Sequence, residues 1–265
     1  AIGAVIAAGT LSKLTYAGLL PGVGLGLILL GYRALPDGRR RALGMLALAG
    51  VVALAPVALY ALFNVAVWHR GGGITAGGLA AATAGKAASG VAVTLPERLD
   101  YIWELYLPRL PFMHHTFFRG YPLANLWLDG SIGRFGWFDY GFPQWVYTVG
   151  RSVFAVLVAL ALVGAFRLRT GIRRLWPIFG CFAVMAAGLL GAIGYAGVRY
   201  RLSTGSQFEQ ARYLFPLLVL YALFTVLAAH GAGRRWSRTL GVALVLLAMA
   251  HGLFAETLTI SRYYG

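Results

Sequence analysis

Two basic side chains lie at the ends of long apolar segments, where an unpaired charge is costly. Lys13 stands between two such segments in GTLSKLTY, and Arg212 opens another in FEQARYLFPLL, directly after Glu209 and Gln210. A lysine binds a phosphate as a point charge, whereas an arginine binds it through two parallel hydrogen bonds. Phosphate binding is therefore one interpretation of both residues, with the adjacent Tyr213 as a hydrogen-bond donor.

Each of these residues also has a purely structural interpretation. A lysine at the end of an apolar helix commonly extends its charge along its aliphatic stem to the membrane surface, and Lys13 is placed to do so. Arg212 can pair with Glu209, and Tyr213 can belong to the aromatic belt at a membrane interface. The residue types alone leave phosphate binding and these structural roles open.

A second set of polar residues lies in an aromatic loop. The segment GRFGWFDYGFPQWVY at 133–147 carries Arg134 and Asp139. Aromatic rings stack on the apolar faces of sugars, and charged groups hold hydroxyls or phosphates, so this composition is typical of a site for saccharides or lipid headgroups. The candidate substrate-binding residues are Arg134, Asp139, Glu209 and Gln210. A structural ion pair between Arg134 and Asp139 is the alternative.

The sequence assigns no catalytic residue, metal ligand or cofactor. His114 and His115 are adjacent, so their side chains point in different directions, and no carboxylate stands at ligand spacing from them. The chain has no phosphate-binding glycine loop, no CxxC pair and no GxSxG motif. A divalent metal is neither required nor excluded by these patterns.

The elements that position these residues are membrane-spanning helices. Hydrophobic residues make up 59% of the chain and charged ones only 12%, too few to cover a water-soluble fold. Blocks without acidic side chains approach the ~20 residues that span a bilayer. They lie at 14–32, 42–63, 153–166, 178–198, 214–229 and 240–255. Because only helices satisfy all backbone hydrogen bonds within such segments, we expect an all-α, polytopic transmembrane helix bundle.

The basic residues predict the orientation of this bundle. Of the 23 Lys and Arg, 11 fall in three short loops: Arg33 with Arg39, Arg40 and Arg41; Arg167 with Arg169, Arg173 and Arg174; Arg234 with Arg235 and Arg238. Short basic loops stay cytoplasmic, and pairs of helices separate these three. Seven of the 8 acidic residues, all except Asp37, then lie on the outer side. We therefore expect the basic residues behind the net charge of +15 to contact anionic lipid headgroups of the bilayer, not nucleic acid.

About seven spans follow from this pattern. We expect helices at 1–12, 15–34, 42–63, 147–167, 175–197, 212–231 and 239–258, the first of them truncated. A long outer loop occupies 64–146, and its Gly/Ala-rich part at 71–94 is either plain loop or an interfacial helix. The chain opens in the middle of an apolar segment without a signal peptide. We therefore expect 1–265 to be one transmembrane domain, the C-terminal part of a larger protein.

One helix is predicted inside the outer loop. Thr94-Leu95-Pro96-Glu97 has the form of a helix start, in which a hydroxyl and a glutamate three residues later cap each other's backbone amides. The predicted helix, 95–107, carries an apolar stripe suited to a membrane interface, formed by Leu99, Ile102, Trp103 and Tyr106. We expect Glu97, Asp100 and Glu104 to form a solvated face.

Four segments together resemble one bacterial family. They are KLT after a glycine-rich apolar helix, YLPRLPFM at 106–113, GRFGWFDYGFPQWVY at 133–147 and QARYLFPLL at 210–218. In order and predicted sidedness they are similar to the domain-of-unknown-function 2142 family of predicted bacterial membrane proteins, across nearly the whole chain. That family is in turn similar to the GT-C superfamily of polyprenyl-phosphate-dependent glycosyltransferases, which includes the protein mannosyltransferases and the aminoarabinose transferases.

The resemblance implies a bacterial inner-membrane protein that takes a sugar from a polyprenyl-phosphate donor at the outer face, in the assembly of envelope polysaccharide or glycolipid. Lys13 and Arg212 would hold the donor phosphate. The catalytic carboxylate of such enzymes lies in the first outer loop, upstream of this chain, so no carboxylate here is assigned as the base. A transporter or flippase of a lipid-linked saccharide and a non-catalytic membrane scaffold are the alternatives.

Overall fold

The computed structural model describes residues 2–12, 14–68, 94–113, 117–118, 120–135, 140–207 and 209–264. These residues form helices, apart from short connections and one antiparallel pair of two-residue strands. The chain divides into two compact units. Unit 1 comprises Ala1–Arg119 and Pro177–Glu209, and unit 2 comprises Gly120–Trp176 and Gln210–Gly265. Each unit is described by itself.

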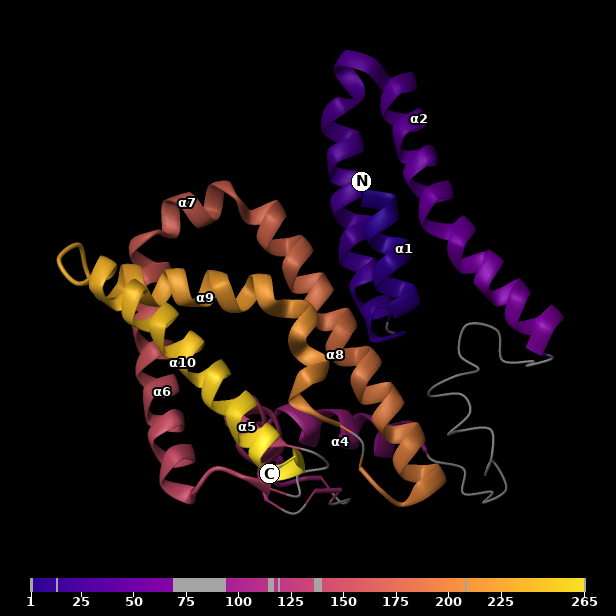
Figure 1. Ribbon diagram of the computed structural model, residues 1–265. Helices are drawn as coiled ribbons and strands as arrows, with labels where there is room; N and C mark the ends of the chain where they lie inside the picture. Colours follow the sequence, from indigo (N-terminus) through magenta and orange to yellow (C-terminus); the bar gives the residue numbers. More distant parts are fainter. Residues whose placement is uncertain are drawn as a thin grey trace. The chain divides into compact units, whose positions relative to one another are not determined.

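Unit 1 is built from α1 (Ile2–Ser12), the 3₁₀ helix η1 (Leu14–Leu19), α2 (Leu20–Trp68), α4 (Leu95–Tyr106) and most of α8 (Trp176–Thr204) (Figure 1). The long α2 is two helices joined at Gly38, where φ is 170° and ψ is 55°. The predicted helices 15–34 and 42–63 are therefore present. They meet at a sharp bend. The helical backbone continues through most of residues 35–41, which we expected to form a loop.

Glycines let η1 and the beginning of α2 approach α8 closely. A Cβ on Gly188 would lie 2.1 Å from the carbonyl oxygen of Gly18, and a Cβ on Gly22 would lie 2.3 Å from Cγ of Met185. Small residues of this kind allow membrane helices to pack backbone to backbone. The paired residue numbers rise in α2 and fall in α8, so the two helices are antiparallel. The bend of α2, with the exposed Arg40 and Arg41, thus lies towards the beginning of α8.

Unit 2 contains the smaller elements between its long helices. They are the π-helix η3 (Leu123–Leu128), α5 (Asp129–Gly133), β1 (Arg134–Phe135), β2 (Tyr140–Gly141), α6 (Gln144–Arg167), α7 (Arg169–Arg174), the 3₁₀ helix η4 (Ala211–Leu217), α9 (Leu218–Gly231) and α10 (Ser237–Tyr264). The predicted helices 147–167, 212–231 and 239–258 correspond to α6, to η4 with α9, and to α10. The predicted helix 212–231 is not uniform, because its beginning, up to Leu217, winds as a 3₁₀ helix that contains Pro216.

The α6–α9 seam holds unit 2 together. A Cβ on Gly164 would lie 2.0 Å from the carbonyl oxygen of Leu227, and one on Gly231 would lie 1.8 Å from that of Leu160. Such contacts leave no space for any side chain, so both glycines are required where the backbones cross. Further along, the stacking of the Phe142 ring on Phe254, at 5.6 Å between centroids, brings the end of α10 back to the beginning of α6.

The protein is a multi-pass, all-α membrane protein. Among the described residues, five helices are long and apolar enough to cross a bilayer, namely Leu43–Val67, Gln144–Arg167, Trp176–Arg201, Ala211–Gly231 and Ser237–Tyr263. Few of their side chains are buried within the protein, as lipid contact requires. Two shorter apolar helices, Ile2–Leu11 and Tyr16–Tyr32, correspond to the first predicted spans. The count of about seven remains a prediction, and residues 71–93 of the Gly/Ala-rich stretch lie outside the described residues.

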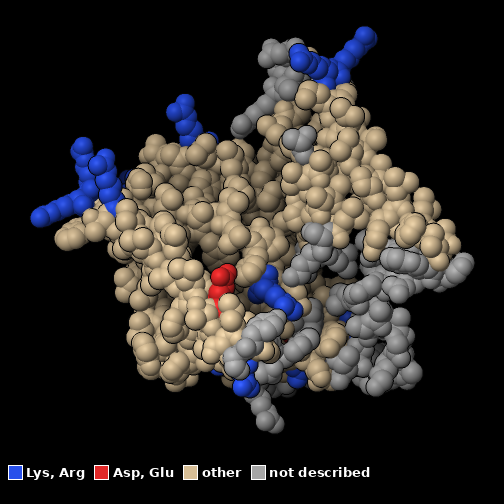
Figure 2. Space-filling model, in the orientation of Figure 1, with Lys and Arg blue, Asp and Glu red and all other residues tan. Residues whose placement is uncertain are grey.

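Charge divides unit 2 along its long helices. Arg167 ends α6, the arginines of α7 follow it, and the turn between α9 and α10 adds Arg234 and Arg235; we call this the arginine end. Figure 2 shows basic side chains projecting at α7 and at this turn. At the opposite end, called the carboxylate end, Asp129 and the hairpin lie beside the beginning of α6. The sequence predicted this separation from the spacing of the loops.

The helix α4 confirms one local prediction and corrects another. Thr94 and Glu97 form the predicted capping box, and α4 spans Leu95–Tyr106. The solvated acidic face was wrong for Glu104, which is only 4% exposed. That face packs inside unit 1 because Tyr101 and Leu105, one turn apart, are buried beside it. The carboxylate of Glu104 accordingly belongs to the protein interior.

The glycine seam makes a stability prediction. Gly164→Val is expected to destabilise the protein by about 2 kcal/mol or more, because its new side chain collides with the backbone of α9. Gly252→Val is the matched control, since its Cβ would meet nothing within 4 Å. Thermal unfolding in detergent micelles measures both. Equal midpoints for the two variants would contradict the close α6–α9 packing.

Candidate functional site

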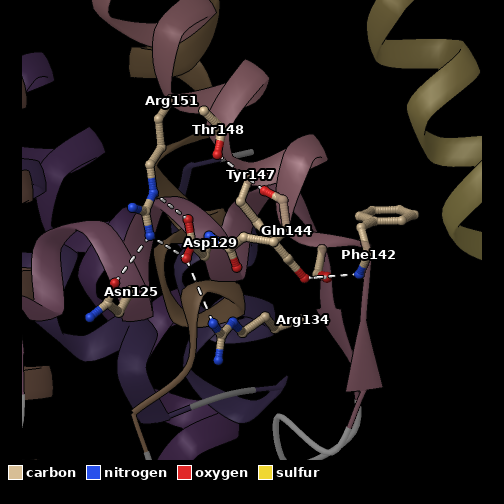
Figure 3. Close-up of polar contacts among 9 residues, drawn as sticks. Asn125, Asp129, Arg134, Phe142, Gln144, Tyr147, Thr148 and Arg151 are labelled. Atoms are coloured by element: carbon tan, nitrogen blue, oxygen red, sulfur yellow. Dashed lines mark hydrogen bonds and ion pairs between the residues drawn. The ribbon is translucent and has the colours of Figure 1, made fainter.

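A buried ion pair lies at the carboxylate end of unit 2. Asp129 begins α5, directly after the π-helical turn, and its side chain is 1% exposed. Arg151, in the second turn of α6, donates from Nε to Oδ1 at 2.8 Å and from Nη2 to Oδ2 at 2.6 Å (Figure 3). This two-pronged contact satisfies both oxygens of the carboxylate. It also fixes α5 against the spanning helix α6.

A second arginine approaches the same carboxylate. Nη2 of Arg134 lies 3.7 Å from Oδ2 of Asp129, beyond hydrogen-bond distance, whereas Nη2 of Arg151 also donates to Oδ1 of Asn125 at 3.1 Å. Figure 3 shows the two guanidinium groups reaching Asp129 from opposite sides. Both arginine side chains are 36% exposed. Two positive charges thus share one negative charge, and the more loosely held Arg134 can contact an incoming anion.

The hairpin that carries Arg134 is pinned by one tyrosine. The Tyr147 hydroxyl donates to the carbonyl oxygen of Gly133 at 2.8 Å and accepts from the backbone N–H of Phe142 at 2.9 Å. A Cβ on Gly141 would lie 2.1 Å from this hydroxyl, so only glycine fits there. The Arg134 guanidinium carbon lies 5.6 Å from the centre of the Tyr147 ring. These contacts hold Arg134 in place before any ligand binds.

The 3₁₀ helix η4 brings two further predicted residues next to this cluster. It packs against both α5 and η3. Arg212 is exposed on η4, with its guanidinium carbon 5.8 Å from the centre of the half-buried Tyr213 ring. Gln210, which precedes η4, is buried. Arg212 therefore lies on an element that packs against α5, the helix directly before Arg134.

Unit 1 holds the other buried carboxylates. Glu209 is fully buried, and its Oε1 accepts a hydrogen bond from the Tyr101 hydroxyl on α4. A Cβ on Gly197 would lie 2.0 Å from the same oxygen, so the carboxylate rests directly on the α8 backbone. Burial, reinforced by the charge of Glu209, raises the pKa of Tyr101 above its ordinary value. The pair therefore keeps the tyrosine neutral and the glutamate hydrogen-bonded.

Glu104 is the third buried carboxylate of the described residues. Its Oε2 accepts from the backbone N–H of Phe117 at 2.9 Å. Its Oε1, which has no hydrogen-bond partner in the described structure, lies 3.7 Å from Nε of the half-exposed Arg109. The Phe117 ring in turn packs edge-on against Tyr101, at 5.3 Å between centroids. Glu104 thus orders the segment after α4 rather than facing solvent.

Sequence reasoning missed two of the residues that organise these sites. Arg151 is the one charged residue in the apolar stretch 144–166, and a lone arginine in a spanning helix is a signal for a buried partner. Tyr101 gave no signal, because its partner Glu209 is 108 residues away. Lys13 and Asp139 lie outside the described residues, so the predicted roles of both and the Arg134–Asp139 pair stay predictions.

Because no family model, curated protein or solved structure matches this chain, the cluster around Asp129 is interpreted from its geometry alone. Within the described ranges, no three His, Cys, Asp or Glu side chains lie close enough to hold a metal ion. The described geometry instead combines buried, satisfied carboxylates with partly exposed guanidinium groups. Chemically, the unit 2 cluster is suited to binding an anion with several oxygens, such as a phosphate.

The ion pair of Asp129 makes a prediction that separates its two arginines. Arg151→Gln is expected to lower the free energy of unfolding by about 2 kcal/mol, because it leaves the buried carboxylate of Asp129 without its two hydrogen bonds from Arg151. Solvent screening of the partly exposed Arg151 keeps the loss from being larger. Arg134→Gln should cost clearly less, since its contact at 3.7 Å is not a hydrogen bond. Thermal midpoints in detergent test this order. Asp129→Asn combined with Arg151→Gln should recover part of the loss, and a reversed order would contradict the assignment.

The Tyr101–Glu209 pair predicts an alkaline limit to stability. Because burial raises the Tyr101 pKa, the folded protein keeps a phenolic proton that the unfolded chain loses above about pH 10. Stability is therefore full below that pH and falls as the pH rises above it. Thermal midpoints between about pH 8 and pH 11 should fall less steeply in Tyr101→Phe. Tyr32→Phe, at an exposed position, should keep the wild-type slope, and identical slopes in all three proteins would refute the prediction.

Proposed function

We propose that this protein is a glycosyltransferase-like protein of the bacterial inner membrane, related to the GT-C superfamily. It transfers a sugar from a polyprenyl-phosphate donor at the outer face, in the assembly of envelope polysaccharide or glycolipid. The carboxylate end of unit 2 is then the outer side. The lipid tail of such a donor lies in the bilayer and its phosphate at the boundary, which is where the carboxylate end of unit 2 meets its spanning helices.

The observation that carries the proposal is the excess positive charge around Asp129. Arg151 neutralises the carboxylate through two hydrogen bonds, so among the described residues the partly exposed Arg134 has no carboxylate within hydrogen-bond distance. Arg212 adds a second exposed guanidinium on the neighbouring η4. Glycosyl transfer from a lipid phosphate leaves negative charge on the departing phosphate, which fixed cations stabilise. Arg134 and Arg212 are the residues that we assign to this role, with Tyr213 beside Arg212, and the proposed phosphate contact of Lys13 rests on the sequence alone.

We assign structural roles to the buried carboxylates of Asp129 and Glu209. Asp129 is held by Arg151, and Glu209 by Tyr101, so both have structural partners. A general base must reach the acceptor hydroxyl and be able to take its proton. We therefore assign neither residue as the base. The predicted sugar contacts of Gln210, Glu209 and Asp139 rest on the sequence alone.

A transporter or flippase of a lipid-linked saccharide is the second candidate. The span Ala211–Gly231 begins with a 3₁₀ helix containing Pro216 and changes to an α-helix at Leu218. Interrupted helices of this kind line the substrate sites of many transporters. The interruption lies at one end of the span, whereas transporter sites lie near the bilayer midplane, so the enzyme is preferred. A scaffold without activity would need neither the interrupted helix nor the excess guanidinium charge.

The function is tested first by donor binding. The purified protein in nanodiscs should bind a polyprenyl phosphate and should bind the corresponding polyprenol, which lacks the phosphate, at least about tenfold more weakly. Arg134→Gln and Arg212→Gln should each weaken phosphate binding by about tenfold, because each removes one charged contact. The control is Arg98→Gln, which removes an exposed arginine from α4. Equal binding of phosphate and alcohol would reject the donor assignment.

Sugar transfer is tested in membranes from cells that express either the native protein or one of its variants. Lys13→Ala and Arg212→Ala are expected to abolish transfer of a labelled sugar from its polyprenyl-phosphate donor, and Arg98→Gln to leave it unchanged. Full turnover in both alanine variants would overturn the donor-phosphate assignment. Movement of the donor across the membrane without any transfer would favour the flippase instead.

A further inference from the structure

The arginine end of unit 2 contains a pocket that the proposed function does not use. It has a volume of about 360 Å³ and is lined by Arg167, His230, Gly233, Arg234, Ser237 and Arg238. These residues come from the end of α6, the end of α9, and the turn into α10. Three of the six carry a guanidinium group and none carries a carboxylate. A pocket of this composition attracts an anion.

Arg167, on one side of this pocket, is held by hydrogen bonds to the end of α9. Arg167 donates from Nη1 to the carbonyl oxygens of Gly231, at 3.0 Å, and His230, at 3.4 Å. These oxygens end α9 and have no partner within their own helix. The α6–α9 seam at Gly164 holds the two helix ends together. Arg167 is therefore fixed by one nitrogen, while its remaining N–H groups are available to a ligand.

The second wall is a tight turn. Gly233 has a φ of 85°, a left-handed conformation that favours glycine, and its N–H donates to the carbonyl of His230 at 3.1 Å. The N–H of Ser237 donates back to the carbonyl of Gly233 at 2.9 Å. A Cβ on Gly233 would lie 3.5 Å from Nη1 of Arg167, so the turn passes within van der Waals contact of this guanidinium group. The turn thus places Arg234 and Arg238 beside Arg167.

No carboxylate that the structure describes in unit 2 is placed to neutralise these arginines. The sequence has no Asp or Glu between Asp139 and Glu209, and none between Glu209 and Glu256. Asp129 pairs with Arg151, which precedes Arg167 by 16 residues and so lies about 24 Å away along α6. At that distance the charge of Asp129 is screened by salt. Within the described part of unit 2, no carboxylate therefore balances this positive charge.

We propose that this pocket is a binding site for the phosphate of an anionic phospholipid in the leaflet at the arginine end. The helices that form it, α6, α9 and α10, all belong to candidate membrane spans that end here, so the pocket lies at headgroup depth. Trp236, 59% exposed in the same turn, is the residue type that anchors proteins at this depth. The Ser237 hydroxyl and the first N–H groups of the long α10 supply further donors. A free phosphate ion would make the same contacts with the arginines. A phospholipid is preferred because its acyl chains stay in the bilayer and so keep its phosphate beside the pocket.

The test counts lipids that stay bound. The full chain is released from nanodiscs of phosphatidylcholine and phosphatidylglycerol, and the retained phosphatidylglycerol is measured by native mass spectrometry. Arg234→Gln combined with Arg238→Gln should reduce retention by about tenfold or more. The matched control is Arg169→Gln combined with Arg173→Gln, which removes the same charge from α7 at the same end but outside the pocket. It should change retention by less than about twofold.

Three results would overturn the proposal. Equal losses in both double variants would mean that the arginines act as a diffuse charge, and no loss in either would mean that the pocket holds no lipid. The third is displacement of the lipid by inorganic phosphate at millimolar concentration, which would show that the site takes a soluble anion. Thermal midpoints without phosphatidylglycerol verify that both variants are folded. None of these measurements depends on sugar transfer or on the residues at the carboxylate end.

Discussion

The two-pronged contact between Arg151 and Asp129 is the interaction on which the carboxylate end of unit 2 depends. A fully buried carboxylate is tolerated only where a cation and hydrogen bonds replace its water. Arg151 supplies both, and because it belongs to a spanning helix, it ties the short elements η3 and α5 to the membrane-embedded part of the unit. The neighbouring Arg134 is thereby left with charge to spare. The candidate phosphate site is a consequence of this imbalance.

Close backbone contact provides the rigid frame for these charges. Gly164 and Gly231 bring α6 and α9 together, and Gly18 and Gly188 do the same for η1 and α8. In a bilayer the lipid is as apolar as the helices, so close packing of small residues contributes what the hydrophobic effect contributes in water. The helix ends are then held at fixed positions, and the side chains on them can converge on one ligand. Both the Arg134 cluster and the Arg167 pocket rely on helix ends held in this way.

The two ends of unit 2 balance their positive charge differently. At the carboxylate end, Asp129 neutralises one of two arginines within the protein. At the arginine end, the sequence supplies no carboxylate, and the guanidinium groups of Arg167, Arg234 and Arg238 are left to external anions. The first arrangement is typical of a selective site, because the protein itself positions the charge. The second is typical of an attachment to lipid headgroups, where anions are always present.

The sequence by itself determined the class of this protein, its helices and the separation of charge between helix ends, because these depend on the spacing of apolar and basic residues along one chain. The capping box at Thr94 and Glu97 was equally local. Tertiary structure decided which charges are buried and paired. Asp129 with Arg151, Tyr101 with Glu209, and the burial of Glu104 join residues from different helices, and no local pattern encodes such contacts. It also decided that η4, which carries Arg212, packs against α5, the helix directly before Arg134, since no sequence spacing encodes that contact.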